Sequence, residues 1–271
     1  MVMSVNTNAG AMIALQSLSA TNRSLETTQL RITTGLKVNG PKDNAATFAI
    51  AQNMRGDIAG LGAVKTNLNL GQSITNVAID AGKAIADLLT EMKAKSVQAS
   101  QEGLDSDSYT ALHEEFTSLR SQIDTIVSTA EFNGKNLITA GASALNVLST
   151  VDGSTIAVGE EVFHQTTLGI ATLTLTTANN ASQARVALDT AITTVSSGLA
   201  SLGSAANRLD IQAEFTGKLQ DILKQGVGNL VDADLAEESA NLQAFQIKQQ
   251  LGVQALAIAN AGPQSILALF S

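Results

Sequence analysis

Apolar residues recur in alternating steps of three and four along most of this chain, with almost nothing to interrupt a helix. The 271 residues include only two prolines, Pro41 and Pro263. A spacing of about 3.5 residues is typical of helices that pack in the manner of a coiled coil. The longest such stretch runs from Ala45 to about Glu102 and predicts a helix roughly 85 Å long at about 1.5 Å per residue. The chain is therefore expected to fold into long, paired helices.

The same spacing occurs near both ends and in the second half. Residues 11–36 carry one row, residues 112–127 another, and the stretch from Ala181 to Ala213 a third. Ser106 or Asp107 is the expected N-cap of the helix that carries the row at 112–127. Glycine and proline break the pattern at 37–44, and Gly226 with Gly228 weaken it at 224–231. We expect connectors at 37–44 and 224–231, a terminal domain from 1–36 plus 232–271, and a helical domain at 45–223.

Residues 140–180 differ from the rest of the chain. The stretches STIAVG (154–159) and TTLGIATLTLTT (166–177) are β-branched, partly alternating and bounded by glycine. Such stretches predict two or three short strands. The predicted fold class is mainly α, with long antiparallel helices forming coiled-coil-like bundles from both chain ends and a small β-hairpin region in the middle.

The composition excludes several classes of function. A formal net charge of −8 without a basic cluster argues against binding to nucleic acid or to an anionic membrane surface. Cysteine is absent, which removes disulfides and thiolate chemistry. No apolar run reaches the ~20 residues of a membrane-spanning helix, and the first ten residues lack the features of a secretory signal. Neither membrane insertion nor a cleaved signal peptide is expected.

The last helix is apolar on more than one side. One row contains Leu235, Leu242, Phe245, Gln249 and Leu256, and a second row contains Ile247, Leu251 and Ile258. One of these rows can pack on the N-terminal helix, whose own row contains Leu15, Leu18, Asn22, Leu25, Gln29 and Ile32. The other row has no intramolecular core to cover it, so we expect other copies of the chain to do so. An alternative is that both terminal helices dock on the long helices and complete a single bundle.

We expect terminal-helix packing and polymerisation to depend on one set of residues. Asn22 and Gln29 are polar members of it, of the kind that fixes register. The full set is Leu15, Leu18, Asn22, Leu25, Gln29, Ile32, Leu235, Leu242, Phe245, Ile247, Gln249, Leu251, Leu256, Ile258, Ile266 and Leu269. Arg208 is a candidate for a polar contact between helices or subunits, and its alternative is an ordinary surface arginine.

Four stretches resemble one known family. They are LRITTGLKVNGPKDNAATFAIAQNMR (30–55), EFNGKNLI (131–138), LASLGSAANRLD (199–210) and the segment from Asp232 to Phe270. Together they resemble a bacterial flagellin of the short type that lacks large outer domains. The hook–filament junction protein, which shares the terminal pattern, is the alternative.

The resemblance implies a function and a set of partners. The chain would be the structural subunit that self-polymerises into the helical flagellar filament for swimming, with the terminal domain forming the inner tube. It would leave the cell through the flagellar type III export apparatus with an export chaperone, and assemble beneath a filament cap protein beside hook-associated proteins. Its location would be the extracellular filament.

No enzymatic or cofactor chemistry is expected from the sequence. HEEFT (113–117) begins like a zinc-protease motif, but Thr117 stands where the second histidine would be needed. His164 has no cysteine to share a zinc site with. A membrane pore-former is a further alternative, but it would need an apolar hairpin long enough to span, and no such hairpin is evident.

Overall fold

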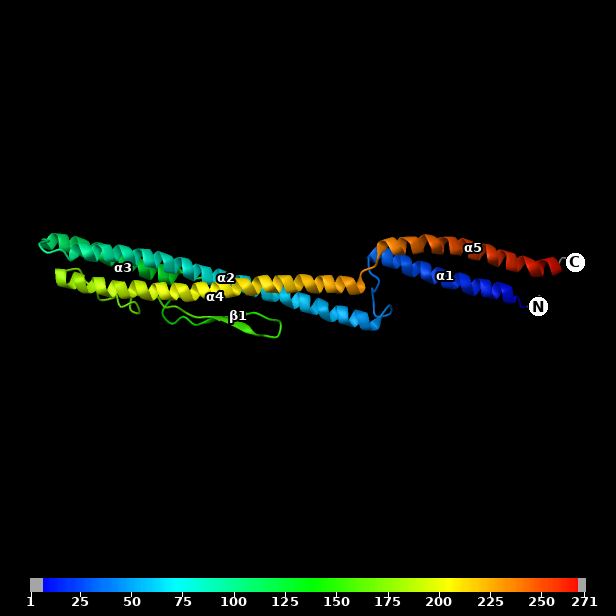
Figure 1. Ribbon diagram of the computed structural model, residues 1–271, viewed down its shortest axis with the longest axis horizontal. Coiled ribbons are helices and arrows are strands. Elements are labelled where there is room, and N and C mark those ends of the chain that lie inside the picture. The colour runs from blue at the N-terminus through cyan, green and yellow to red at the C-terminus, as the bar shows by residue number, and fades with distance from the viewer. Residues whose placement is uncertain (1–6, 268–271) are drawn as a thin grey trace. The chain divides into compact units, whose positions relative to one another are not determined.

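The computed structural model of the protein describes residues 7–267, and the side chains of residues 7–261. In chain order the elements are α1 (Ala9–Thr34), α2 (Ala45–Ala99), α3 (Ser106–Thr129), β1 (Leu145–Leu148), β2 (Thr155–Val158), α4 (Ala178–Val231) and α5 (Leu235–Leu267). Figure 1 shows long helices lying alongside one another and one small hairpin. The predicted fold class is confirmed.

The chain forms two compact units, which are described separately below. The terminal unit comprises Met1–Gly56 and Ile222–Ser271, and the central unit comprises Asp57–Asp221. The boundary falls inside α2 and inside α4, so each of these two helices contributes residues to both units.

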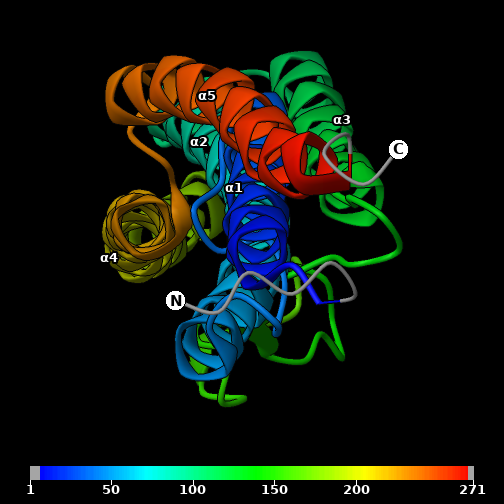
Figure 2. The same cartoon turned by 90° about the vertical axis from the view of Figure 1, so that its right-hand side faces the viewer.

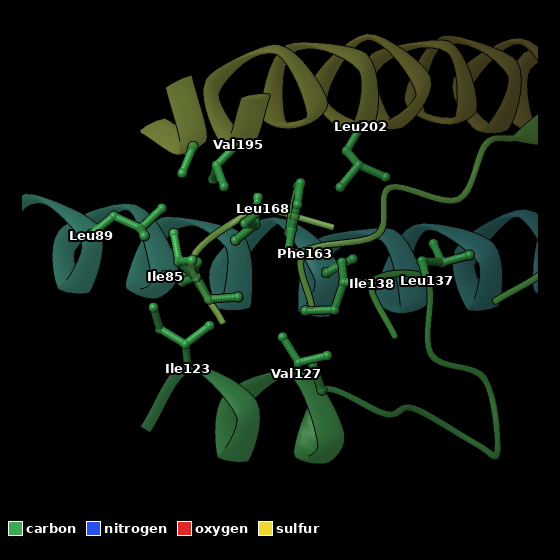
Figure 3. Packing of buried hydrophobic residues seen from close by; sticks show 14 of the residues in the cluster. Ile85, Leu89, Ile123, Val127, Leu137, Ile138, Phe163, Leu168, Val195 and Leu202 are labelled. Carbon is green, nitrogen blue, oxygen red and sulfur yellow. The ribbon is translucent and has the colours of Figure 1, made fainter. Parts of the chain in front are cut away.

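The central unit has a continuous apolar core. Ile85 and Leu89 from α2, Ile123 and Val127 from α3, and Val195 and Leu202 from α4 meet there, with Phe163 between them (Figure 3). Phe163 is 1% exposed, and its ring occupies the space that a side chain at Gly198 would need. The heptad-like spacing of the sequence therefore corresponds to helix faces that are buried in this core.

Two ion pairs join the central helices at their edges. Lys93 on α2 lies 2.5 Å from Asp189 on α4, and Lys95 on α2 lies 2.5 Å from Glu115 on α3. The hydrogen bond to Glu115 and the charge of that carboxylate raise the pKa of Lys95. Both pairs are partly exposed, so their main effect is on helix register rather than on stability.

The hairpin packs on α2 at a glycine, which leaves room for a hairpin side chain. β1 and β2 are antiparallel, with Leu145 opposite Val158. Val147 lies directly over Gly71, where a Cβ would come within 2.5 Å of a Val147 methyl carbon. The Gln212 side chain on α4 donates a 2.9 Å hydrogen bond to the Ser149 carbonyl. The hairpin is thus held on both long helices.

The second predicted strand, 166–177, is wrong: this segment consists of turns and coil, and the strand paired with β2 is Leu145–Leu148. The side chains of Leu168, Ile170 and Leu175 are buried, as a strand pattern requires. The backbone, however, bonds to side chains of α3. Arg120 donates to the carbonyls of Ala171 and Leu173, at 2.8 and 3.1 Å, and the Leu175 amide donates to His113 Nδ1 at 3.3 Å. These partners replace a neighbouring strand.

The structure also differs from the sequence at two helix ends. Asp105, rather than the expected Ser106 or Asp107, caps α3 and accepts a hydrogen bond from the Ser108 amide. Residues 224–231, expected as a connector, are the last turns of α4. At Gly226 a Cβ would lie only 2.9 Å from the Met54 Cε of α2. The glycine therefore permits close packing of two helices and does not break one.

Candidate assembly surface on the terminal helices

Side chains cap the N-termini of both terminal helices. Asn8 Oδ1 accepts a hydrogen bond from the Ala11 amide at the start of α1, and Gly35 ends the helix with φ of 71°. Asp234 Oδ1 accepts from the Ala236 and Glu237 amides at the start of α5. Glycine suits the left-handed conformation at Gly35, since it lacks a Cβ.

A short backbone ladder joins the end of α1 to the start of α5. Leu36 and Asp232 form an antiparallel bridge. The Lys37 amide donates to the Val231 carbonyl at 2.7 Å, and the Ala233 amide donates to the Gly35 carbonyl at 2.9 Å. This ladder makes the two helices antiparallel neighbours although they are far apart in the sequence.

Contacts along the pair follow that antiparallel order. Arg31 Nη1 lies 2.8 Å from Glu238 Oε1, and Gln249 Nε2 donates to Asn22 Oδ1 at 2.9 Å. Farther along, Leu18 packs where Gly252 leaves room, and Asn8 Nδ2 donates to the Ala259 carbonyl at 2.7 Å. Figures 1 and 2 both show α1 and α5 side by side.

Most of the expected packing residues lie along this contact. On α1, Leu18, Asn22, Leu25 and Ile32 are half-buried. On α5, the half-buried residues are Leu242, Phe245, Gln249 and Leu256. Asn22 and Gln249, two polar members of the predicted set, bond to each other. That bond favours one register, since any slip would separate the two amides.

Three predicted inner positions are corrected by the structure. Leu15 is 57% exposed, Leu235 is 50% exposed, and Gln29 also lies at the surface. The buried positions are Thr28 on α1 and Glu238 on α5, which sequence reasoning missed. On α1 two contacts lie one residue earlier than predicted, at Ala14 and Thr28, whose smaller side chains allow closer approach.

The face of α5 opposite α1 is apolar and exposed. Ile247 and Leu251 are each 58% exposed and Ile258 is 75% exposed. Their spacing of four and seven residues places them in one row, which we call the α5 outer face. The sequence left open which of the two rows on this helix packs on α1, and in the structure this row is the one that faces away from α1. Ile266 and Leu269 lie outside the residues whose side chains are described.

Helix α1 also carries an exposed apolar surface. Met12 is 64% exposed and Ile13 is 65% exposed, and Leu15 lies beside them. We call these three residues the α1 outer face. Each helix of the pair therefore presents large apolar side chains to solvent.

Charge is confined to one half of the pair. Residues 9–22 and 249–267 contain no Asp, Glu, Lys or Arg. Because the helices are antiparallel, these two stretches lie at the same end of the terminal unit. The charged residues Arg31 and Glu238 belong to the other half. Contacts made by the uncharged end must depend on apolar burial and neutral hydrogen bonds.

Candidate sites for other chemistry gain no support. No cluster of His, Cys, Asp and Glu suited to a metal occurs within the part of the chain that the structure describes. His113 accepts the Leu175 amide and His164 bonds to Thr166, so both act within the central unit. Arg208 is exposed and has no hydrogen-bond or ion-pair partner among the described residues. No helix between residues 7 and 267 is long and apolar enough to cross a membrane.

Two family models match the chain. The bacterial flagellin N-terminal helical region matches residues 5–142, and the bacterial flagellin C-terminal helical region matches residues 186–270. The chain belongs to the bacterial flagellin family. It is therefore a structural protein, a subunit of the flagellar filament, in a family that is not enzymatic.

Individual flagellins match over nearly their whole length. Flagellin FljK of Caulobacter vibrioides is 48% identical over 268 residues, which cover 98% of each chain. A flagellin of Brucella melitensis is 37% identical over 280 residues, covering 98% of this chain and 99% of the relative. These lengths agree with a flagellin that lacks large outer domains.

Solved structures share the fold. Bacillus cereus flagellin has a TM-score of 0.51 at 26% identity and covers 55% of this chain and 88% of that one. A flagellar hook-associated protein of Vibrio parahaemolyticus has a TM-score of 0.57 at 15% identity over 70% of this chain and 100% of that one, which shows the fold alone. The alternative of a junction protein is not better supported than flagellin.

Proposed function

We propose that copies of this flagellin polymerise through the α1–α5 pair, with residues 1–36 and 232–271 forming the inner tube of the filament. The observation that supports this is the α5 outer face, whose three large apolar side chains point away from α1. Water-exposed apolar rows on this scale are typical of surfaces that bind another protein. Residues 45–223 would surround the tube, and the residues at 37–44 together with the last turns of α4 would join the two parts.

Assembly supplies what the isolated terminal pair lacks. Fixing one residue costs about 1–2 kcal/mol of conformational entropy, and burying apolar surface returns about 25 cal/mol per Å². A pair that leaves Ile247, Leu251 and Ile258 in water recovers little of this cost by itself. Several neighbouring copies in a helical tube would cover these side chains and order both helices.

The wider life history is also proposed. Copies would leave the cell unfolded through the type III export apparatus with an export chaperone, without a cleaved signal, and assemble beneath a cap protein on hook-associated proteins. The extracellular filament would then serve swimming motility. The family membership supports these steps, as does the terminal apolar surface, which a chaperone would shield before assembly. Arg208, exposed on α4, would provide a polar contact between subunits.

A charge placed on the α5 outer face tests the proposal. Ile258→Glu should abolish polymerisation of the full chain, because a carboxylate buried between copies has no partner. Gln246→Glu adds the same charge at an exposed polar position of α5 away from that row and should polymerise. Sedimentation and electron microscopy measure filaments, and circular dichroism checks that the central unit stays folded. Filaments of Ile258→Glu at the wild-type level would contradict the proposal.

A further inference from the structure

A two-residue turn follows α3 in the central unit. Phe132 and Lys135 form an antiparallel bridge, in which the Phe132 amide donates to the Lys135 carbonyl at 2.9 Å and the Lys135 amide donates back at 3.0 Å. Between them φ is 51° at Asn133 and 77° at Gly134. Among the residues that the structure describes, Asn133 is the one residue other than glycine with a positive φ. Positive φ at both central residues identifies a type I′ turn.

The Asn133–Gly134 pair combines two groups that can react with each other. The backbone nitrogen that follows an asparagine can attack the side-chain amide, and glycine hinders that attack least because it lacks a Cβ. Asn133 and Gly134 are both exposed. Neither the Asn133 side chain nor the Gly134 amide has a hydrogen-bond partner within the described part of the chain. The turn therefore leaves both reacting groups in water.

The type I′ conformation nevertheless keeps the two groups apart. The attack closes a five-membered ring, which requires Asn133 Cβ and the Gly134 nitrogen to lie on the same side of the Asn133 Cα–C bond. A type I′ turn has ψ of about +30° at its first central residue, as the mirror image of a type I turn. The torsion from Cβ to the next nitrogen is then roughly 150°, so that nitrogen points away from the side chain. The folded turn blocks ring closure, and unfolding permits it.

We propose that Asn133 is a site of spontaneous deamidation in the unfolded chain and that folding of the turn protects it. The Gly134 nitrogen bonds to Asn133 Cγ, the bond from Cγ to Nδ2 breaks, and the proton of the attacking nitrogen leaves with Nδ2 as ammonia. Water then opens the cyclic imide at either carbonyl and gives aspartate or isoaspartate at position 133. The reaction needs only an unfolded central unit and does not depend on polymerisation.

Isoaspartate would keep the turn from closing again. Its backbone runs through the former side chain and is one carbon longer, so a two-residue turn no longer fits the bridge between Phe132 and Lys135. The residues that follow this bridge enter the core, where Leu137 is 1% exposed and Ile138 is 0% exposed. A copy that stays unfolded long enough to form isoaspartate therefore loses the means to complete its central unit.

The wild-type chain tests the protection directly. It is incubated at mildly alkaline pH in buffer and in guanidinium chloride, and timed samples are digested and analysed by mass spectrometry. We expect deamidation at Asn133 in denaturant and at least about tenfold less in buffer, because the folded turn must open first. Asn39–Gly40, the other Asn-Gly pair of the sequence, should convert in denaturant at a similar rate. Equal conversion of Asn133 in both solutions, or none in denaturant, would overturn the proposal.

A variant tests whether the turn itself gives the protection. The Asn136 side chain donates to the Val127 carbonyl at 2.6 Å and accepts the Ile138 amide at 2.9 Å, which fixes the chain just after the turn. Asn136→Ala should therefore deamidate faster than the wild type in buffer and at the same rate in denaturant. Circular dichroism checks that its central unit is folded. A folded Asn136→Ala chain that converts no faster than the wild type would refute protection by the turn.

Refolding tests the effect of isoaspartate. Wild-type chains aged in denaturant are returned to buffer and treated with protease, and the position-133 products are compared in the resistant and the digested fractions. Isoaspartate should be found in the digested fraction, whereas Asn133→Asp, which carries the ordinary aspartate product, should refold like the wild type. Isoaspartyl chains with the same resistance as Asn133→Asp would show that the turn tolerates the longer backbone and would overturn this step. None of these measurements requires filaments, so they stand apart from the test of polymerisation.

Discussion

The central and terminal units use the same kind of helix but bury different kinds of side chain. In the central unit the largest buried side chains are apolar, among them Phe116, Phe163 and Leu68, each less than 2% exposed. In α1 and α5, among the residues with described side chains, the buried ones are Thr28 and Glu238. The large apolar residues of the terminal helices are instead half-buried, as Leu18 and Phe245 are, or exposed, as Ile13 and Ile258 are.

This difference shows where each unit obtains its stability. The central unit encloses its apolar surface with its own helices, hairpin and turns, as a globular domain does. The terminal pair has two helices only, and two helices cannot enclose each other. Its polar contacts, such as Asn22 with Gln249, select a register but contribute little free energy. A unit of this kind needs further copies to cover its exposed apolar side chains.

The largest expected effect is on protease resistance. In the unassembled chain, we expect both termini to be trimmed and the segment from about Asn53 to Gln220 to be spared. The terminal helices should be cut about tenfold faster for every 1.4 kcal/mol by which their opening costs less than that of the central unit. Mass spectrometry of timed digests measures the cut sites, and filaments serve as the protected control. Resistant termini in the unassembled chain would argue against a unit completed by neighbours.

Two phenylalanines offer the next comparison. Phe163→Ala should lower the free energy of unfolding of the central unit by about 3–5 kcal/mol, because it leaves a cavity among α2, α3 and α4. Phe245→Ala removes the same group from half-buried surroundings in the terminal unit. Urea denaturation followed by circular dichroism should show no shift of the central transition for Phe245→Ala. A shift equal to that of Phe163→Ala would mean that the two units unfold as one.

A pair of glycines gives a smaller effect within the central unit. Gly71→Ala places a Cβ 2.5 Å from a methyl carbon of Val147, so overpacking should destabilise the unit by about 1–3 kcal/mol, reduced by the gain in helix propensity. Gly203→Ala meets nothing within 4 Å and should stabilise α4 by up to about 1 kcal/mol. Thermal melts of both variants measure the difference. Equal stabilisation by both variants would show that the hairpin moves away from the new Cβ at no cost in free energy.

The sequence predicted the helices well because long periodic segments depend on local spacing. It did not predict which of two neighbouring rows faces the partner. Leu15 and Ala14 both fit steps of three and four, and the structure selects the row with the smaller residue because the backbones then approach more closely. Hydrophobicity alone favours Leu15, which lies exposed.

The strand predicted at 166–177 shows a second limit. Its alternation correctly indicates buried side chains at Leu168 and Ile170. Strand formation also needs a backbone partner, and here Arg120 and His113 of α3 supply it. Nothing in the spacing of α3 distinguishes these side chains from ordinary surface residues. The two apolar rows of the last helix, in contrast, were visible in the sequence, although spacing alone did not tell which of them packs on α1.

The smallest expected effect concerns the start of α3 in the central unit. The hydrogen bond from the Ser108 side chain and, as a smaller contribution, the one from its amide lower the pKa of Asp105 below its ordinary value of 3.8. The folded state therefore favours the ionised form, and this contribution is present above pH 3.8 and is lost as the pH falls through the lower folded value. Asp105→Asn keeps a capping side chain that does not titrate. The melting temperature of the wild type should be equal or slightly higher at neutral pH, and should fall relative to Asp105→Asn in acid. A difference between the two proteins that stays constant from about pH 6 to pH 2 would show that the cap does not depend on ionisation of Asp105.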